Sequence, residues 1–104
     1  LPSDPGHKIW KRDFEGAASL FSFVLDPASD KAVAAFVDAL ELFGIGSSWG
    51  GYESLLIPCD QELRRTDASW VKSKAGPLLR VHVGLESLAD LKADLETAFA
   101  AMRA

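Results

Sequence analysis

The alternation of apolar and polar positions along the chain predicts three β-strands, at residues 20–25, 53–57 and 78–83. The first strand is rich in aromatic and β-branched residues, which favour extended structure. Successive side chains of a strand point to opposite faces. In the third strand Arg80 and His82 therefore share one face, while aliphatic residues occupy the other.

Two longer segments repeat their apolar residues at intervals of three and four, which predicts amphipathic helices at residues 30–43 and 88–103. Ser29 and Ser87 stand where a side chain commonly caps the N-terminus of a helix. Gly44 stands where a glycine commonly follows the C-terminus. The apolar stripe of the first helix consists of Val33, Phe36, Val37, Leu40 and Phe43.

The remaining segments are connections. Residues 1–19 read as an irregular lead-in, residues 44–52 as a glycine-rich loop, and residues 59–77 as a long polar connection. The element order β-α-β-β-α predicts a two-layer α+β sandwich, with three mostly antiparallel strands and both helices on one face. We expect residues 20–104 to form this single domain.

The composition agrees with one globular domain, because 104 residues of which 48% are hydrophobic can build a core. Fifteen acidic residues against 11 basic ones give a net charge of −4. This balance weighs against nucleic acid and anionic membranes as partners, since both require a basic surface. The sequence shows no membrane-spanning run and no signal peptide.

Cys59 is the single cysteine, so the chain can form no internal disulfide, and a cytoplasmic protein is expected. No set of Cys and His residues has metal-ligand spacing, so no metal site is predicted. The sequence begins at Leu1 and its only methionine is Met102. We therefore expect a processed chain or a piece of a longer protein.

The loop Ser47-Ser48-Trp49-Gly50-Gly51-Tyr52 has two interpretations. It can be a tight turn between a helix and a strand. Alternatively, the large aromatic Trp49 lines a pocket, and the glycines let the backbone approach a ligand closely.

Arg80 lies in an otherwise apolar strand and also has two interpretations. It can point to solvent together with His82, or its guanidinium can bind a carboxylate through two parallel hydrogen bonds. For His82 itself a packing or surface role is favoured over a catalytic one.

Three further patterns are interpreted without function. Ser69-Trp70-Val71-Lys72 matches the Ser-x-x-Lys motif of acyl-serine enzymes, but it falls in a polar connection rather than at a helix start, so we treat it as chance. Asp90 and Asp94 are expected on the solvated side of the last helix, and Cys59 is expected to be inert. The residues alone thus indicate a substrate clamp without a nucleophile and base.

Five stretches in order along the chain, residues 5–7, 10–14, 20–25, 48–55 and 79–86, closely resemble the C-terminal domain of bacterial cystathionine β-lyases. These enzymes belong to the Cys/Met-metabolism family of pyridoxal-phosphate enzymes, which have the aspartate-aminotransferase-like fold (fold type I). The resemblance implies that the parent protein cleaves L-cystathionine to homocysteine, pyruvate and ammonia. It also implies a homotetramer that acts in methionine biosynthesis.

The resemblance implies roles for four residues of this chain. Arg80 grips the α-carboxylate of an amino-acid substrate, and the backbone at Trp49 assists. Ser48 helps to orient the catalytic lysine, which lies outside this chain, and Ser47 replaces a tyrosine that in some members lines the distal substrate pocket. Tryptophan at position 49 is typical of the β-lyases, whereas γ-lyases and γ-synthases usually have leucine there.

The chain lacks the Ser-x-Thr-Lys motif that carries the Schiff-base lysine in the family, so this fragment is expected to hold no cofactor and to be inactive alone. Pyridoxal phosphate would be bound by the large domain of the parent. The alternative function is a free-standing ligand-sensing or adaptor domain, since β-α-β-β-α units also build small regulatory modules.

Overall fold

The computed structural model describes residues 1–67 and 69–104, so that Ala68 alone lies outside the described residues. The elements, in chain order, are α1 (His7–Asp13), β1 (Leu20–Val24), α2 (Asp30–Asp38), β2 (Leu55–Pro58), the 3-10 helix η1 (Asp60–Glu62), α3 (Ser69–Ser73), β3 (Leu78–His82) and α4 (Leu88–Arg103).

The three strands form one antiparallel sheet, as expected from the order of the elements, and the strand order is β1-β3-β2. Arg80, in the middle of the central strand, lies between Ser22 of β1 and Ile57 of β2. β2 begins two residues later than expected and ends on Pro58. A proline is tolerated there because β2 is an edge strand, which does not need every backbone donor.

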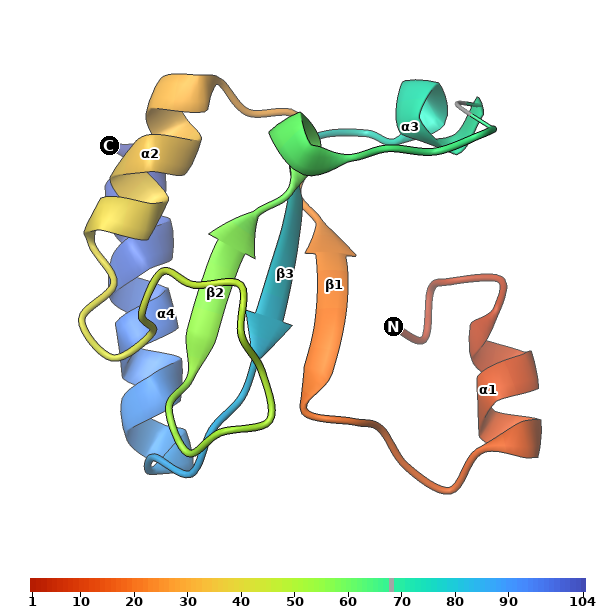
Figure 1. Cartoon of the computed structure of the whole chain (residues 1–104), viewed down its shortest axis with the longest axis horizontal. Coiled ribbons are helices and arrows are strands. Elements are labelled where there is room, and N and C mark those ends of the chain that lie inside the picture. Colours follow the sequence, from red (N-terminus) through yellow and green to blue (C-terminus); the bar gives the residue numbers. More distant parts are fainter. Residues whose placement is uncertain (68) are drawn as a thin grey trace.

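The helices α2 and α4 lie side by side and cover one face of the sheet (Figure 1). Phe36 of α2 is fully buried, and its ring lies 4.8 Å from that of Phe99 on α4. Leu79 and Val81 of β3 complete this core from the sheet. The α+β sandwich expected from the sequence is confirmed.

Beyond small shifts at the ends of the strands, the lead-in and the first core helix differ from what was predicted. The lead-in is not irregular throughout, because His7–Asp13 form α1, which buries no side chain. The first core helix ends at Asp38 instead of residue 43, so Gly44 does not follow its C-terminus. Phe43 still belongs to the core, which explains why the apolar stripe extended beyond the helix.

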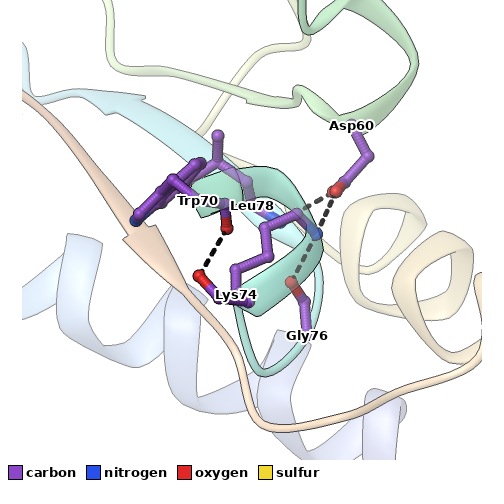
Figure 2. Close-up of polar contacts among 6 residues, drawn as sticks. Asp60, Trp70, Lys74, Gly76 and Leu78 are labelled. Atoms are coloured by element: carbon purple, nitrogen blue, oxygen red, sulfur yellow. Dashed lines mark hydrogen bonds and ion pairs between the residues drawn. The ribbon is translucent and has the colours of Figure 1, made fainter. Parts of the chain in front are cut away.

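The polar connection 59–77 contains η1 and α3 and is closed at its base by side chains (Figure 2). The ammonium group of Lys74 pairs with Asp60 and donates a 2.7 Å hydrogen bond to the Gly76 carbonyl. Asp60 also accepts a 2.7 Å hydrogen bond from the backbone N–H of Leu78. Burial opposes the charge on Asp60, but these bonds outweigh it and lower the pKa of Asp60. The connection is therefore anchored beside β3.

α3 extends away from the sheet and its helices (Figure 1). Arg65 lies over the Trp70 ring at 4.8 Å, and Trp70 is half-exposed. No helix in the described part of the chain is long and apolar enough to cross a membrane.

Candidate functional site

The glycine-rich segment after α2 is a loop whose two ends are paired. The backbone N–H of Gly44 donates to the Ser54 carbonyl at 3.0 Å, and the N–H of Leu56 donates to the Gly44 carbonyl at 2.9 Å. Within this loop the backbone of Ser47, Gly50 and Gly51 contacts Arg80 and His82, which share the face of β3 opposite to the core residues Leu79 and Val81.

Ser54 fastens the C-terminal end of this loop to the segment after β3. It is fully buried and donates to Glu86 through its backbone N–H (2.8 Å) and its hydroxyl (2.7 Å). Its hydroxyl oxygen in turn accepts from the backbone N–H of Gly84 at 2.8 Å. These bonds from Ser54 hold the pKa of the Glu86 carboxyl below its usual value. This pair was not predicted, because Ser54 and Glu86 lie 32 positions apart in the sequence.

Asp94 fastens the N-terminal end of the loop, which corrects the expectation of a solvated carboxylate. The side chain is only 8% exposed, and its oxygens accept from the backbone N–H groups of Glu41, Leu42 and Phe43 at 2.8, 2.9 and 3.2 Å. The expectation was wrong because α2 ends early, which leaves these donors to be satisfied by a side chain. Asp90, one turn earlier on α4, is exposed as expected.

Arg80 is half-buried, and its guanidinium donates through Nη2 to the backbone carbonyl of Ser47 at 2.5 Å. The side chain therefore does not simply point into solvent, which was one of its two interpretations. One donor edge is held by the loop, and a guanidinium has five donors. The described contacts thus leave the guanidinium oriented by the loop through one of these donors.

Trp49 lies two residues after the carbonyl that orients Arg80, and its side chain is 62% exposed. Ser47 and Ser48 are exposed as well. Gly50 has φ +84°, a left-handed conformation that favours glycine. The segment is not a tight turn between a helix and a strand, because α2 ends at Asp38 and β2 begins at Leu55. Trp49 is thus exposed near the Ser47 carbonyl that Arg80 contacts, and a pocket lined by Trp49 stays a prediction.

His82 is buried, with 4% exposure, and lies on the same face of β3 as Arg80. Its ring nitrogens meet the loop at Gly50 and Gly51. The structure thus supports the packing interpretation of this histidine and excludes the solvent-facing one.

A cavity of about 660 Å³ opens beside His82, between the loop, the start of β1 and the end of β3. Its lining residues are Ala17, Ala18, Ser19, Phe21, Gly50, Gly51, Tyr52, His82, Val83, Gly84 and Leu85. Arg80 and Trp49 stand outside this lining. The four candidate substrate residues thus form an open surface rather than an enclosed pocket.

Two minor sequence patterns are placed by the structure. Ser69 begins the short helix α3, so the expectation that the Ser-x-x-Lys stretch is not at a helix start was wrong. Ser69 and Lys72 are both exposed, and the stretch lies in the arm that extends from the sheet. For Cys59, burial raises the pKa of the thiol, which agrees with an inert cysteine.

Among the described residues, no group of three His, Cys, Asp or Glu side chains is arranged to hold a metal ion. Lys74 is the most buried lysine with described contacts, and its nitrogen is taken by Asp60 and the Gly76 carbonyl. The lysines at 8, 11, 31, 72 and 92 are exposed.

A family model described as Cys/Met metabolism PLP-dependent enzyme matches residues 1–100. The chain belongs to this family. The match covers the loop, Arg80 and the helices that support them, and it confirms the family expected from the sequence. Pyridoxal phosphate is the cofactor of the family.

The curated relatives of this Cys/Met-metabolism chain are longer proteins. A putative cystathionine beta-lyase of Rhizobium johnstonii is 49% identical over 109 residues, which cover 100% of this chain and 26% of the relative. The cystathionine beta-lyase of Salmonella typhimurium is 46% identical, and the match covers 96% of this chain and 26% of the relative. An L-alanine/L-glutamate racemase of Wolbachia pipientis is 41% identical over 96% of the chain and 25% of its own length. The chain thus spans about a quarter of the length of these relatives.

The chain also matches about a quarter of a solved structure. The cystathionine gamma synthase from Xanthomonas oryzae pv. oryzae, in complex with cystathionine, matches with a TM-score of 0.80 and 32% identity. The match covers 99% of this chain and 27% of that one. The fold is therefore that of a part of a fold type I pyridoxal-phosphate enzyme.

Proposed function

We propose that this chain is the C-terminal, substrate-binding domain of a pyridoxal-phosphate-dependent carbon–sulfur lyase. The whole protein cleaves L-cystathionine, with one water, to homocysteine, pyruvate and ammonia. The observation that carries the proposal is the guanidinium of Arg80, oriented by the Ser47 carbonyl beside Trp49. Relatives named as cystathionine beta-lyases, at 49% and 46% identity, support the reaction.

In this proposal Arg80 binds the α-carboxylate of the amino acid. The planar fork of an arginine matches a carboxylate with two hydrogen bonds. Since Ser47 already orients the guanidinium, less conformational freedom is lost when the substrate binds. A fixed carboxylate fixes the orientation of the whole amino acid, so the clamp acts on turnover as well as on affinity.

The loop supplies the other contacts. The backbone at Trp49 assists in holding the carboxylate, and the exposed indole forms one wall of the site. The hydroxyl of Ser48 helps to orient the catalytic lysine, which belongs to the rest of the protein. The open surface around Arg80 is then closed by the cofactor-binding domain, to which residues 1–19 lead.

The proposal includes the wider context of the protein. The partners are an amino-acid substrate, the cofactor-binding domain and further copies of the same protein in a homo-oligomer. The compartment is the cytoplasm, and the pathway is methionine biosynthesis. The acidic net charge of the chain fits the absence of nucleic acid from this set of partners.

The test uses the full-length protein that contains this chain. Incubated with L-cystathionine and pyridoxal phosphate, it should release pyruvate and homocysteine in equal amounts. The 104-residue chain alone should release neither. A full-length protein that forms no pyruvate would refute the lyase, and binding of an amino acid by the chain alone would favour the alternative of a ligand-sensing domain.

A second candidate function is amino-acid racemisation, which the racemase relative at 41% identity favours. An α-carboxylate clamp serves a racemase equally well, because it holds the amino acid and leaves the reaction to the cofactor. The same full-length protein distinguishes the two functions. Formation of D-alanine from L-alanine without pyruvate from cystathionine would favour the racemase.

A further inference from the structure

Both ring nitrogens of His82 bind the backbone of the loop that carries Trp49. Nδ1 lies 3.4 Å from the backbone nitrogen of Gly50, and Nε2 lies 3.0 Å from the carbonyl oxygen of Gly51. A backbone N–H only donates and a carbonyl oxygen only accepts. Nδ1 must therefore accept, and Nε2 must carry the hydrogen, which is the neutral Nε2–H tautomer.

Arg80 and His82 hold the two ends of one short segment. They lie two positions apart on β3 and so face the same side of the sheet. Arg80 binds the carbonyl of Ser47, and His82 binds the backbone of Gly50 and Gly51. In the sequence, Trp49 lies between the residues that bind Arg80 and those that bind His82.

In the described part of the chain, no other side chain forms the hydrogen bonds that His82 forms with this loop. Among the hydrogen bonds of the described residues, those of His82 are the ones that reach residues 48–51. The next fastening follows at Tyr52, whose carbonyl accepts from the backbone N–H of Leu85 at 2.9 Å. Because a buried polar group without partners is costly, loss of these contacts would leave the ring nitrogens of His82 and the backbone of Gly50 and Gly51 unpaired.

We propose that His82 is a positioning residue for the substrate site. It holds the Ser48–Trp49 segment beside the guanidinium of Arg80, in its neutral Nε2–H form. This inference rests on the proposed function for its kinetic consequence, whereas its structural consequence is independent of the reaction.

The test compares His82→Leu with His82→Gln in the full-length holoenzyme. Leucine fills space without hydrogen bonds, whereas the amide nitrogen of glutamine reaches the position of Nε2 and donates to Gly51. His7→Leu is the matched control, because His7 lies on the exposed helix α1, away from the loop. Hydrogen exchange is measured in peptides that cover residues 47–53 and residues 88–103, together with kcat and KM for cystathionine.

In His82→Leu the exchange of residues 47–53 should rise about tenfold, the factor that corresponds to about 1.4 kcal/mol. Exchange in residues 88–103 should stay at the wild-type rate. KM should rise by a similar factor, with a smaller change in kcat, because the loop no longer stays beside Arg80. His82→Gln should restore most of both effects, and His7→Leu should show neither.

Wild-type exchange and wild-type KM in His82→Leu would overturn the inference. A rise of exchange in residues 88–103 equal to that in 47–53 would also overturn it, since His82 would then only stabilise the fold. If His82→Leu does not fold, His82→Asn takes its place, because asparagine reaches the Nδ1 position but not Gly51. Asparagine at wild-type exchange would overturn the inference. If the lyase proposal is wrong, the wild-type protein forms no pyruvate from cystathionine. Hydrogen exchange in residues 47–53 then still decides whether His82 holds the loop.

Discussion

The carboxylate of Asp94 on α4 accepts a 3.2 Å hydrogen bond from the buried backbone N–H of Phe43, a residue 51 positions earlier in the chain. Glu41 and Leu42 donate to the same carboxylate. One side chain thus satisfies three consecutive backbone donors that the early end of α2 leaves unpaired. Since this segment leads directly into the loop that carries Trp49, α4 supports the candidate site although it lies on the other face of the sheet.

Replacement of Asp94 by asparagine should destabilise the chain. The amide keeps one acceptor oxygen but turns its NH₂ group toward a backbone donor. We expect a loss of about 1–3 kcal/mol in the free energy of unfolding, measured by urea denaturation. Asp90→Asn, at an exposed position one turn earlier, is the control and should cost less than about 1 kcal/mol. Equal losses in the two variants would contradict the role of Asp94.

Truncation of Phe36 should be more damaging. This side chain is fully buried against Phe99, so Phe36→Ala removes apolar contacts and leaves a cavity. We expect a loss of about 3–5 kcal/mol in urea denaturation. Phe14, which is 63% exposed, provides the comparison, and Phe14→Ala should change the stability little. If Phe36→Ala lost less than about half a kcal/mol in the free energy of unfolding, the apolar stripe of α2 would not face the core.

The Glu86–Ser54 pair should make stability depend on pH. The bonds from Ser54 lower the pKa of Glu86 in the folded state, so the unfolded chain binds the proton more readily. This stabilisation is present above the ordinary pKa of a glutamate, about 4.3, and is lost as the pH falls through the lower folded value. Unfolding measured from pH 7 to pH 3 should show the loss in the wild type and a smaller one in Glu86→Gln. If the free energy of unfolding fell equally with pH in the wild type and in Glu86→Gln, the Glu86–Ser54 pair would not be the cause.

Arg80 should be sensitive even to lysine. Arg80→Lys keeps the positive charge but loses the planar fork, so kcat/KM of the full-length protein for cystathionine should fall at least about tenfold. Arg80→Ala should lose more, because hydrogen bonds to a charged group contribute about 1.5–3 kcal/mol each. The deficit should be much smaller with an analogue that lacks the α-carboxylate. The same deficit with both compounds would show that Arg80 supports only the fold.

The fold was largely predictable from the sequence because burial in strands and helices follows a local period. The extent of α4 and the pairing of Leu79 with Val81 on one face of β3 depend only on neighbouring residues, and both were predicted. Burial did not follow the same alternation, since His82 on the other face of β3 is buried as well. The end of α2 was not predicted, because Phe43 continues the helical spacing while its backbone N–H bonds to a residue far along the chain. Periodicity reports which side chains are buried and does not report which backbone groups pair.

The candidate site was partly predictable for a different reason. Arg80 stood out as a charge within an apolar strand, and Trp49 as a large aromatic in a glycine-rich loop. The side chains that hold this loop did not stand out, since His82, Glu86 and Asp94 each have partners more than 30 positions away. A polar residue whose partner is distant in sequence resembles a solvated one until the fold is known.

The strand order β1-β3-β2 makes the middle strand the last to be synthesised. Until residues 78–82 leave the ribosome, β1 and β2 have no partner between them and expose unpaired backbone edges, which are prone to aggregate. The antiparallel ladder of β1 must also wait for a segment more than 50 residues downstream, and such long-range pairing is slow. Nascent chains that stop before Leu78 therefore lack this sheet, and we expect residues 20–77 to be recognised in them by chaperones and proteases as unfolded.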